Sequence, residues 1–296
     1  MREFEVSTDS TCDLYAQEIK DLDVFFVPLH YTIEINGKLN EYTDNFTQYS
    51  QYVEYYNLLR KGYMAKTSMN NLATHVDHFM DMAKKGVKNA IHFTISYPLS
   101  PTVDVANQAV EEVKKTYPDF NCVCVECHTT TIGQGMLVRM ACKFRDEGRD
   151  LNYVANYLND VKTKIQHFIL VDDLMHLRRG GRVGSANAII GSALKIKPIL
   201  IFTKEGRLEA YKKEMGFKKA IKTIIDEFGK YTLNPEYDIV NIVHTDNLEA
   251  AQLLEKGLQE KYGVKTRIQI MGPIIGAHVG PNSVAYGFVS NEERPA

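Results

Sequence analysis

Residues 170–203, LVDDLMHLRRGGRVGSANAIIGSALKIKPILIFT, form the stretch that says most about how this chain folds. The β-prone residues 167–171 predict a strand. Asp172 or Asp173 can cap the helix that follows, because a carboxylate accepts hydrogen bonds from the free N–H groups at a helix start. Gly180 and Gly181 predict the end of that helix, since glycine adopts the left-handed conformation at little steric cost.

The same stretch continues into a second helix and a second strand. Residues 186–194 are almost all small or apolar, which predicts a buried helix, and Ser185 can cap its start. Lys197 and Pro198 predict its end, and residues 199–202 are typical of a covered strand. We therefore expect strand, helix, glycine hinge, helix and strand in succession.

Three arginines, Arg178, Arg179 and Arg182, surround the two glycines of the hinge. Guanidinium groups fixed on a short glycine turn suit a carboxylate or a phosphate. The alternative is a surface helix end whose cations face the negative end of the helix dipole. The stretch by itself leaves both interpretations open.

Length and composition are those of a soluble globular protein. A chain of 296 residues with 44% apolar residues can form one large domain or two ordinary ones. The formal net charge of -2 gives no indication of a nucleic-acid surface. No apolar run reaches the roughly 18–20 residues that span a bilayer, and the first residues are too polar for a signal peptide. We therefore expect a cytoplasmic protein without stable membrane insertion.

Three of the five cysteines, Cys122, Cys124 and Cys127, lie close together, and His128 follows the last of them. Cys124 and Cys127 have the spacing of one half of a zinc site, but the chain has no second half. The favoured interpretation is a buried strand, residues 121–126, with reduced thiols as small core side chains.

Hydroxyl-rich turns are the main feature of the first half of the chain. The turns are residues 7–13, 66–71, 96–102 and 127–131. Strands are predicted before them, among others at residues 3–7, 90–96 and 121–126, with helices between. This alternation predicts a doubly wound, Rossmann-like parallel sheet, whose carboxyl ends bring such turns together. Converging hydroxyls could hold an anionic head group, although each could instead be a helix cap.

Local features of the first half allow further predictions. Asp9 can position neighbouring hydroxyl or backbone groups. Residues 23–35 predict a strand at an edge or a bulge, because they contain a proline, and Asn36-Gly37 predicts a hairpin. Residues 46–60 predict a helix with a core-facing stripe. The stripe consists of Tyr49, Tyr52, Val53, Tyr56 and Leu59.

The second half mixes hairpin-like turns with two longer helices, which predicts an α/β sandwich with a mixed sheet. We place the two domains at residues 1–162 and 163–296. A short strand is predicted at residues 207–211, and a glycine-rich turn at residues 272–281. His278 in that turn could bind a carboxylate, or it could be satisfied by backbone groups.

Enzyme signatures are mostly absent. The chain has no G-x-x-x-x-G-K-[ST], no G-x-G-x-x-G opening a helix, no H-E-x-x-H and no G-x-S-x-G. Residues 179–184, RGGRVG, imitate a glycine-rich loop but follow a predicted helix rather than a strand. No pair of carboxylates shows a division into acid and base. We therefore expect a protein that is not an enzyme and needs no cofactor.

Six motifs, spread in order along nearly the whole chain, carry a resemblance to a known family. They are DSTCDL (9–14), KTS (66–68), SYPLSPT (96–102), DLMHLRRGGRV (173–183), LKIKPIL (194–200) and GAHVGP (276–281). Together they resemble the DegV family of bacterial fatty-acid-binding proteins. The segment from residue 173 to residue 200 is the most specific part of the match.

The resemblance implies two α/β domains with one long-chain fatty acid buried between them, in a carrier that is not itself a catalyst. By position, it implies contacts to the carboxylate from both domains. The residues implied there are Thr67, Ser68, Ser96, Ser100, His278 and Arg178. The residues implied along the acyl tail are Ile189, Ile190 and Leu194.

The resemblance also implies a partner, since some members present the bound acid to a separate fatty acid kinase subunit. Related members often carry an R-x-R pair where this chain has Met215 and Phe217. This departure leaves open an alternative, a sensor or regulator of lipid state with the same pocket and no kinase. Pro101 replaces the usual glycine of the serine loop and would stiffen the mouth of the pocket.

Overall fold

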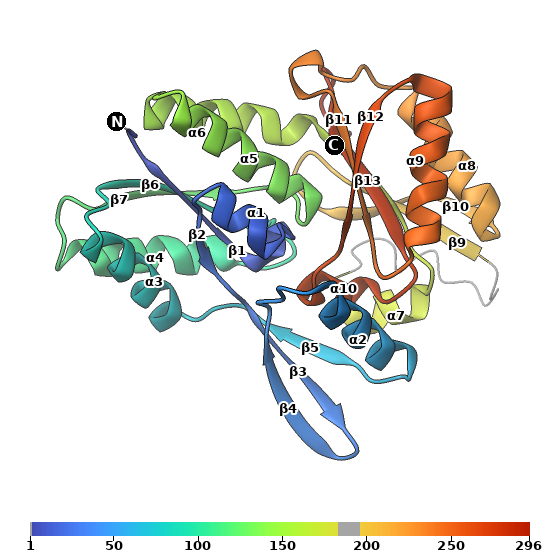
Figure 1. The fold of residues 1–296 in the computed structure, drawn as a ribbon, viewed down its shortest axis with the longest axis horizontal. Helices are drawn as coiled ribbons and strands as arrows, with labels where there is room; N and C mark the ends of the chain where they lie inside the picture. The colour runs from blue at the N-terminus through green and yellow to red at the C-terminus, as the bar shows by residue number, and fades with distance from the viewer. Residues whose placement is uncertain (1, 183–195) are drawn as a thin grey trace.

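The computed structural model describes residues 2–182 and 196–296, and it contains a parallel four-stranded sheet, a mixed six-stranded sheet and a small three-stranded sheet (Figure 1). The predicted α/β class, with a parallel sheet first and a mixed sheet second, is confirmed. The predicted helix at residues 186–194, with Ser185 and the implied tail contacts Ile189, Ile190 and Leu194, lies outside the described residues.

The parallel sheet is formed by the first half of the chain and is covered by helices on both faces, as predicted. Its spatial order is β2 (Phe25–Val27), β1 (Glu5–Asp9), β6 (Asn89–Thr94) and β7 (Asn121–Glu126). The helices are α3 (Leu72–Lys84) and α4 (Thr102–Lys114) on one face, and α5 (Ile132–Asp146) and α6 (Leu151–Val161) on the other. Because successive strand residues point to opposite faces, Ala90 packs with the first pair and Ile91 with the second.

The strand predicted at residues 23–35 is wrong as a single element. The chain leaves the parallel sheet after β2 and enters the three-stranded sheet as β3 (His30–Ile35). Pro28 lies between the two strands, where its missing N–H removes no ladder bond. The predicted hairpin is confirmed: β3 pairs with β4 (Lys38–Thr43), and both turn residues, Asn36 and Gly37, have positive φ.

The KTS segment is a strand rather than a loop. Residues Ala65–Ser68 form β5, which pairs antiparallel with β3 and sets Thr67 opposite Tyr31. Helix α2 (Tyr49–Arg60) follows this sheet's hairpin and buries Tyr52, Tyr56 and Leu59 as predicted. Tyr49 is exposed because it lies at the helix start, Val53 is half-buried, and Tyr55 is buried although the predicted stripe did not include it.

The six-stranded sheet is formed by the second half of the chain. Its order is β10 (Leu208–Met215), β9 (Ile196–Phe202), β8 (Ile165–Leu170), β13 (Val284–Val289), β11 (Ile239–His244) and β12 (Lys265–Ile270). Only β11 and β12 are parallel. Helices α8 (Phe217–Phe228) and α9 (Leu248–Tyr262) cover one face. β9 begins earlier and β10 runs longer than predicted, since Pro198 pairs with Lys213 inside the ladder.

Two short helices lie against the uncovered face of this sheet. α7 (Leu174–Gly180) begins and ends as predicted, because the Asp173 carboxylate accepts from the Met175 N–H and Gly181 has a φ of 75°. The glycine-rich turn predicted around His278 is wrong, since residues Pro273–Val279 form helix α10. Proline at the first helical position needs no N–H partner, so the sequence is compatible with a helix start there.

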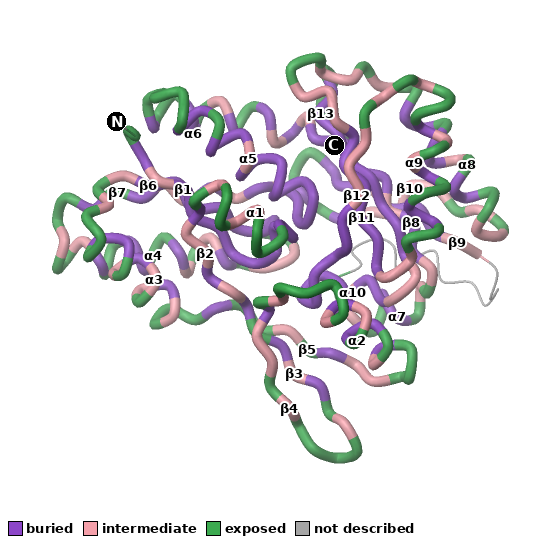
Figure 2. The backbone as a smooth tube through the Cα atoms, in the orientation of Figure 1, coloured by how far each residue is buried: buried purple, intermediate pink, exposed green. Residues whose placement is uncertain are grey.

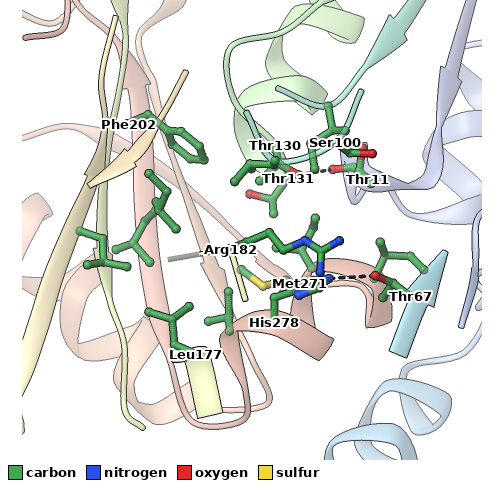
Figure 3. Close-up of a pocket in the computed structure, with 18 of the residues that line it drawn as sticks. Thr11, Thr67, Ser100, Thr130, Thr131, Leu177, Arg182, Phe202, Met271 and His278 are labelled. Carbon is green, nitrogen blue, oxygen red and sulfur yellow. Dashed lines mark hydrogen bonds between the residues drawn. The ribbon is translucent and has the colours of Figure 1, made fainter. Parts of the chain in front are cut away.

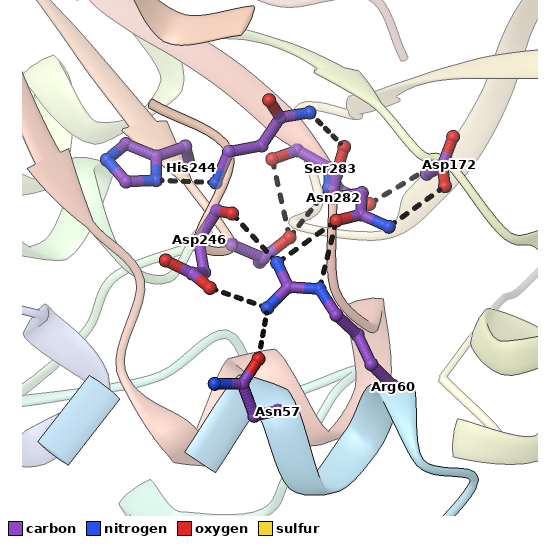
Figure 4. A network of polar contacts seen from close by, with 9 residues as sticks. Asn57, Arg60, Asp172, His244, Asp246, Asn282 and Ser283 are labelled. Atoms are coloured by element: carbon purple, nitrogen blue, oxygen red, sulfur yellow. Dashed lines mark hydrogen bonds and ion pairs between the residues drawn. The ribbon is translucent and has the colours of Figure 1, made fainter. Parts of the chain in front are cut away.

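A polar network joins α2 to the loops at the ends of β11 and β13 (Figure 4). Arg60 donates from Nη1 to Asp246 Oδ2 at 2.6 Å and from Nη2 to the Asp246 carbonyl at 2.8 Å. Asn282 accepts from the same guanidinium, and Ser283 Oγ accepts from the Asp172 N–H. The network connects the small sheet's helix to the six-stranded sheet.

The remaining described elements are short. They are η1 (Ser10–Cys12), α1 (Ala16–Asp21), η2 (Lys162–Lys164) and η4 (Pro235–Tyr237). Figure 2 shows the strands of the two large sheets mostly buried and the tip of the β3–β4 hairpin exposed. Among the helices of the described residues, none is both long and apolar enough to cross a bilayer.

Three histidines, His75, His78 and His92, are packed between α3 and the parallel sheet, and their lowered pKa values make stability depend on pH. His75 is fully buried, neither of its ring nitrogens has a hydrogen-bond partner in the described chain, and its ring lies 5.6 Å from that of His92. Burial lowers the pKa of His75 to about 4. Below about pH 6.5 the unfolded chain therefore binds a proton at this histidine, whereas the folded chain does not until the pH approaches 4. Between these two values the free energy of unfolding falls by about 1.4 kcal/mol per pH unit for each such histidine.

His75→Leu is expected to flatten the pH dependence of unfolding. Stability at pH 7 stays equal or rises, because leucine fills the site without burying an unpaired ring nitrogen. Between pH 6.5 and pH 4.5 the variant loses less stability than the unchanged protein, as measured by urea denaturation. His30→Leu, at an exposed position on β3, is the control. Parallel stability curves for His75→Leu and the unchanged protein would contradict this assignment.

Candidate functional site

A cavity lies between the carboxyl ends of the parallel strands and the uncovered face of the six-stranded sheet (Figure 3). It has a volume of about 270 Å³. One side is rich in hydroxyl groups, two histidines and one arginine also line the cavity, and the other described lining residues are apolar. The hydroxyl-bearing residues that line it are Thr11, Thr67, Ser68, Ser100, Thr130 and Thr131. These come from four separate segments of the first half of the chain.

His278 connects the hydroxyl side of the cavity to the end of α7. Its Nδ1 lies 2.8 Å from the Gly180 carbonyl oxygen, and its Nε2 lies 2.8 Å from Thr67 Oγ1. A carbonyl oxygen only accepts, so Nδ1 carries the hydrogen and Nε2 of the neutral ring accepts from the Thr67 hydroxyl. Burial lowers the pKa of His278, and the nearby Arg182 acts in the same direction. Both effects favour the neutral form of the His278 ring.

Arg182, rather than Arg178, is the arginine that lines the cavity. Figure 3 shows its guanidinium on the side of the cavity where His278 and Thr67 lie. Its Nη1 donates to the Gly180 carbonyl oxygen at 3.3 Å. Arg178 lies on the exposed surface of α7 and is not among the lining residues. The hinge therefore gives the cavity one cation, beside its histidine.

Ser96 does not line the cavity, although Thr67, Ser68, Ser100 and His278 do. Its hydroxyl is fully buried and donates to the Gly206 carbonyl oxygen at 2.7 Å. Gly206 lies in the turn between β9 and β10, and His128 Nδ1 is 2.7 Å from the Lys204 carbonyl oxygen of the same turn. In this structure Ser96 therefore ties the β9–β10 turn to the parallel sheet.

Asp9 positions one of the lining hydroxyls, as the sequence suggested. Its Oδ1 accepts from the Thr11 N–H at 2.9 Å, from the Thr11 hydroxyl, and from Gln134 Nε2 at 3.0 Å. The carboxylate is fully buried, and burial raises its pKa. Its acceptor role fixes the orientation of the Thr11 side chain at the edge of the cavity.

The apolar wall was missed in the sequence. The residues concerned are Leu29, Ile95, Leu99, Ile169, Val171, Leu177, Leu200, Phe202, Leu208, Met271, Ile274, Ile275, Val279 and Ala285. Strand alternation would have identified part of it: His167, Ile169 and Val171 face the cavity, while Phe168 and Leu170 pack under α8 and α9. Continuous apolar runs hide this alternation, since both faces of the strand are covered.

Gly180 permits the close packing of α7 on α10. A Cβ there would lie 2.8 Å from His278 Cα and 2.9 Å from the His278 carbonyl oxygen. Gly180→Ala is expected to separate the two helices and to lower the free energy of unfolding by about 1–3 kcal/mol. It is also expected to lower the affinity for a ligand that contacts His278. Gly181→Ala is the matched control, because its Cβ would meet nothing within 4 Å and its cost is only that of a φ of 75°. Thermal unfolding and ligand titration of both variants test this, and equal ligand affinity in the two would refute it.

Comparisons with known proteins agree with the resemblance seen in the motifs. A family model described as "Uncharacterised protein, DegV family" matches residues 3–291. A DegV domain-containing protein of Clostridium perfringens is 34% identical over 296 residues, covering all of both chains. One of Streptococcus pyogenes is 30% identical over 292 residues, or 98% of this chain and 99% of that protein.

Solved structures are similar over the same length. A DegV lipid-binding protein of Thermotoga maritima has a TM-score of 0.84 at 25% identity, covering 99% of this chain and 100% of the other. A fatty-acid-binding DegV family protein of Streptococcus agalactiae has a TM-score of 0.82 at 29% identity, with the same coverage.

Proposed function

Because this chain belongs to the DegV family, we propose that it binds one long-chain fatty acid in the cavity between its two large sheets. The observation that supports the proposal is the separation of polar and apolar side chains in the cavity wall. A cluster of hydroxyls, His278 and Arg182 occupies one side, and apart from His167 the remaining described lining residues are apolar. A fatty acid has this same division into a carboxylate and an apolar tail.

The carboxylate is proposed to lie beside Thr67, His278 and Arg182. An ionised carboxylate taken out of water needs several donors to offset its lost hydration. The Thr67 hydroxyl can turn from His278 to the ligand, and a protonated His278 Nε2 can then donate as well. Arg182 supplies a positive charge close by. Two of the proposed donors, Thr67 and His278, are already within hydrogen-bond distance of each other.

The acyl tail is proposed to lie along the wall formed by β8, β9 and α10. Burying about sixteen methylenes at roughly 0.8 kcal/mol each gives a large favourable transfer term. The ordering of a flexible chain and its lost translational freedom reduce that term. Enough remains for a fatty acid to be retained through purification.

The protein is proposed to act as a carrier, with the chemistry done elsewhere. None of the lining residues within 2–182 and 196–296 is an aspartate, a glutamate or a cysteine, so this part of the chain offers the cavity no acidic group and no thiol nucleophile. A fatty acid kinase subunit is the proposed partner that would receive the head group. The competing function is a sensor of lipid state. Met215 favours this alternative, because related members often have the first arginine of an R-x-R pair at this position. Here the position, at the end of β10, holds an apolar side chain that is 58% exposed.

Native mass spectrometry of the purified chain tests the first proposal. One bound fatty acid per chain is expected, either retained from the host or taken up from added palmitate or oleate. A chain that carries no acid and takes up neither would refute the proposal. Affinity capture of a kinase subunit from cells that express both proteins would separate the carrier from the sensor.

A further inference from the structure

A second cavity, outside the proposed fatty-acid site, is lined by two buried carboxylates. It has a volume of about 330 Å³ and shares no lining residue with the first cavity. Asp13 reaches it from the end of η1, and Asp44 from the residue after β4. Both residues are buried, since Asp13 is only 8% exposed and Asp44 only 7% exposed.

Each of these carboxylates has an unused oxygen. Asp13 Oδ1 accepts from the Gly272 N–H at 3.0 Å, at the start of α10. Oδ2 of Asp13 and Oδ2 of Asp44 are buried and have no hydrogen-bond partner in residues 2–182 and 196–296. A Cβ on Gly272 would lie 2.5 Å from Asp13 Oδ1 and 3.5 Å from Asp44 Oδ2, so both carboxylates converge on the same glycine.

Among the described residues that line this cavity, none is a lysine, an arginine or a histidine. The lining residues are Ser10, Asp13, Leu14, Ala16, Ile19, Phe26, Asp44, Asn45, Phe46, Thr47, Tyr52 and Gly272. Buried carboxylates are normally paired with a cation, because an unpaired buried charge costs several kcal/mol. The described lining residues therefore supply no positive charge to pair with the two carboxylates.

The rest of the wall favours an organic cation over a metal ion. Calcium takes six to eight oxygen ligands, and the described chain has no group of three or more His, Cys, Asp or Glu side chains placed to hold a metal. Much of the wall is instead aliphatic or aromatic, with rings from Phe26, Phe46 and Tyr52. Aromatic rings attract cations and also pack against an apolar body.

We propose that this cavity binds a small primary amine, whose ammonium group donates to Asp13 and Asp44 and whose alkyl body packs against Phe46 and Tyr52. An ammonium group has three donors, enough for both unused Oδ2 atoms. The bound amine would join three segments that line the cavity together, namely the β1–α1 connection, the end of β4 and the start of α10.

Protons compete with the amine for this site. Burial raises the pKa of Asp44 to about 7, and it raises the pKa of Asp13 well above its ordinary value, with Asp44 adding to the effect. The other titratable groups facing Asp44 are Asp9, Tyr31, Tyr52, Tyr55 and Tyr56. The tyrosines are uncharged at neutral pH, since burial raises their pKa values. Amine affinity is therefore expected to fall as the pH is lowered through 7.

Calorimetric titration of the full-length chain with butylammonium chloride at pH 8 tests the proposal. Saturable binding at one site per chain is expected, with butanol and calcium chloride giving no binding. Asp44→Asn is expected to weaken butylammonium at least tenfold, while Asp77→Asn, at an exposed position on α3, leaves it unchanged. Phe46→Leu keeps both carboxylates and is expected to weaken butylammonium binding severalfold. This variant provides the test if Asp44→Asn does not fold.

Three results would overturn the proposal. They are no heat from butylammonium at millimolar concentration, calcium binding in its place, and equal butylammonium affinity in the unchanged chain and a folded Asp44→Asn variant. The last result would mean that butylammonium binds somewhere other than at the Asp44 carboxylate. None of these measurements requires a fatty acid, so their failure is independent of the proposed carrier function.

Discussion

Thr67→Val and His278→Phe are each expected to weaken fatty-acid binding by about 10- to 100-fold, the equivalent of one hydrogen bond to a charged group at 1.5–3 kcal/mol. Both substitutions remove a polar group beside the proposed carboxylate and keep the side chain's approximate size. Titration of delipidated protein with a fluorescent fatty acid measures the effect. The cavity wall is otherwise unchanged, so the loss reflects the head group.

Ser96→Ala is the control for these two variants. Ser96 bonds the Gly206 carbonyl and does not line the cavity, so a change below about threefold is expected if the contacts seen here persist with ligand bound. The sequence motif alone implies a head-group contact for the same serine. A loss at Ser96→Ala as large as at Thr67→Val would favour that assignment and contradict the placement proposed here.

His278 should also make fatty-acid affinity depend on pH. Burial holds its pKa below the usual value in the empty site, and a carboxylate beside Nε2 would raise the pKa again. Between the two pKa values, binding takes up a proton, so affinity rises as the pH falls from about 8 toward 6. His278→Phe is expected to abolish this rise. An equal pH dependence in the variant would exclude His278 as its source.

Ile169→Trp is expected to block the proposed acyl site and lower fatty-acid affinity more than tenfold. Ile169 lies on β8 with its side chain against the cavity, opposite Ala285 of β13 on the same face. An indole there would occupy space that the tail needs, and because the cavity can accept it, the fold should lose less than about 3 kcal/mol.

Ile201→Trp is the matched control for Ile169→Trp. Ile201 lies on the neighbouring strand β9, but it packs on the opposite face, beneath α8. The same change of residue in the same sheet is therefore expected to leave fatty-acid affinity within about threefold. Binding curves for both variants, with thermal unfolding to check the fold, provide the test. Unimpaired binding by Ile169→Trp would show that the tail lies elsewhere.

Local signals in the sequence predicted the features that depend on a few neighbouring residues. Asp173 as a helix cap, Gly181 as a helix end and Asn36-Gly37 as a hairpin turn were all confirmed, because each depends on the conformational preference of one or two residues. The alternation of strands and helices likewise predicted the parallel sheet, since each amphipathic element must bury one face.

Sheet membership could not be predicted in the same way. The chain passes from β2 to β3 within a few residues and changes sheets, and β5 joins β3 through pairing with residues more than thirty positions away. Strand propensity gives the likelihood of an extended chain and not the identity of its partner. His278 was expected in a turn and lies in α10, because packing against α2 and α7 outweighs the low helix propensity of Gly276.

By itself, the sequence determined the fold class, the family and the hydroxyl, histidine and arginine groups that could meet an anion. Only the tertiary structure decided which of them share a cavity: Thr67, His278 and Arg182 do, while Ser96 is turned to the β9–β10 turn and Arg178 to the exposed surface. Tertiary structure also brought Asp13 and Asp44 together around Gly272, across distances that no local pattern records. The physical reason is that a side chain's chemistry is encoded at its own position, whereas its neighbours are chosen by how the whole chain buries its apolar surface.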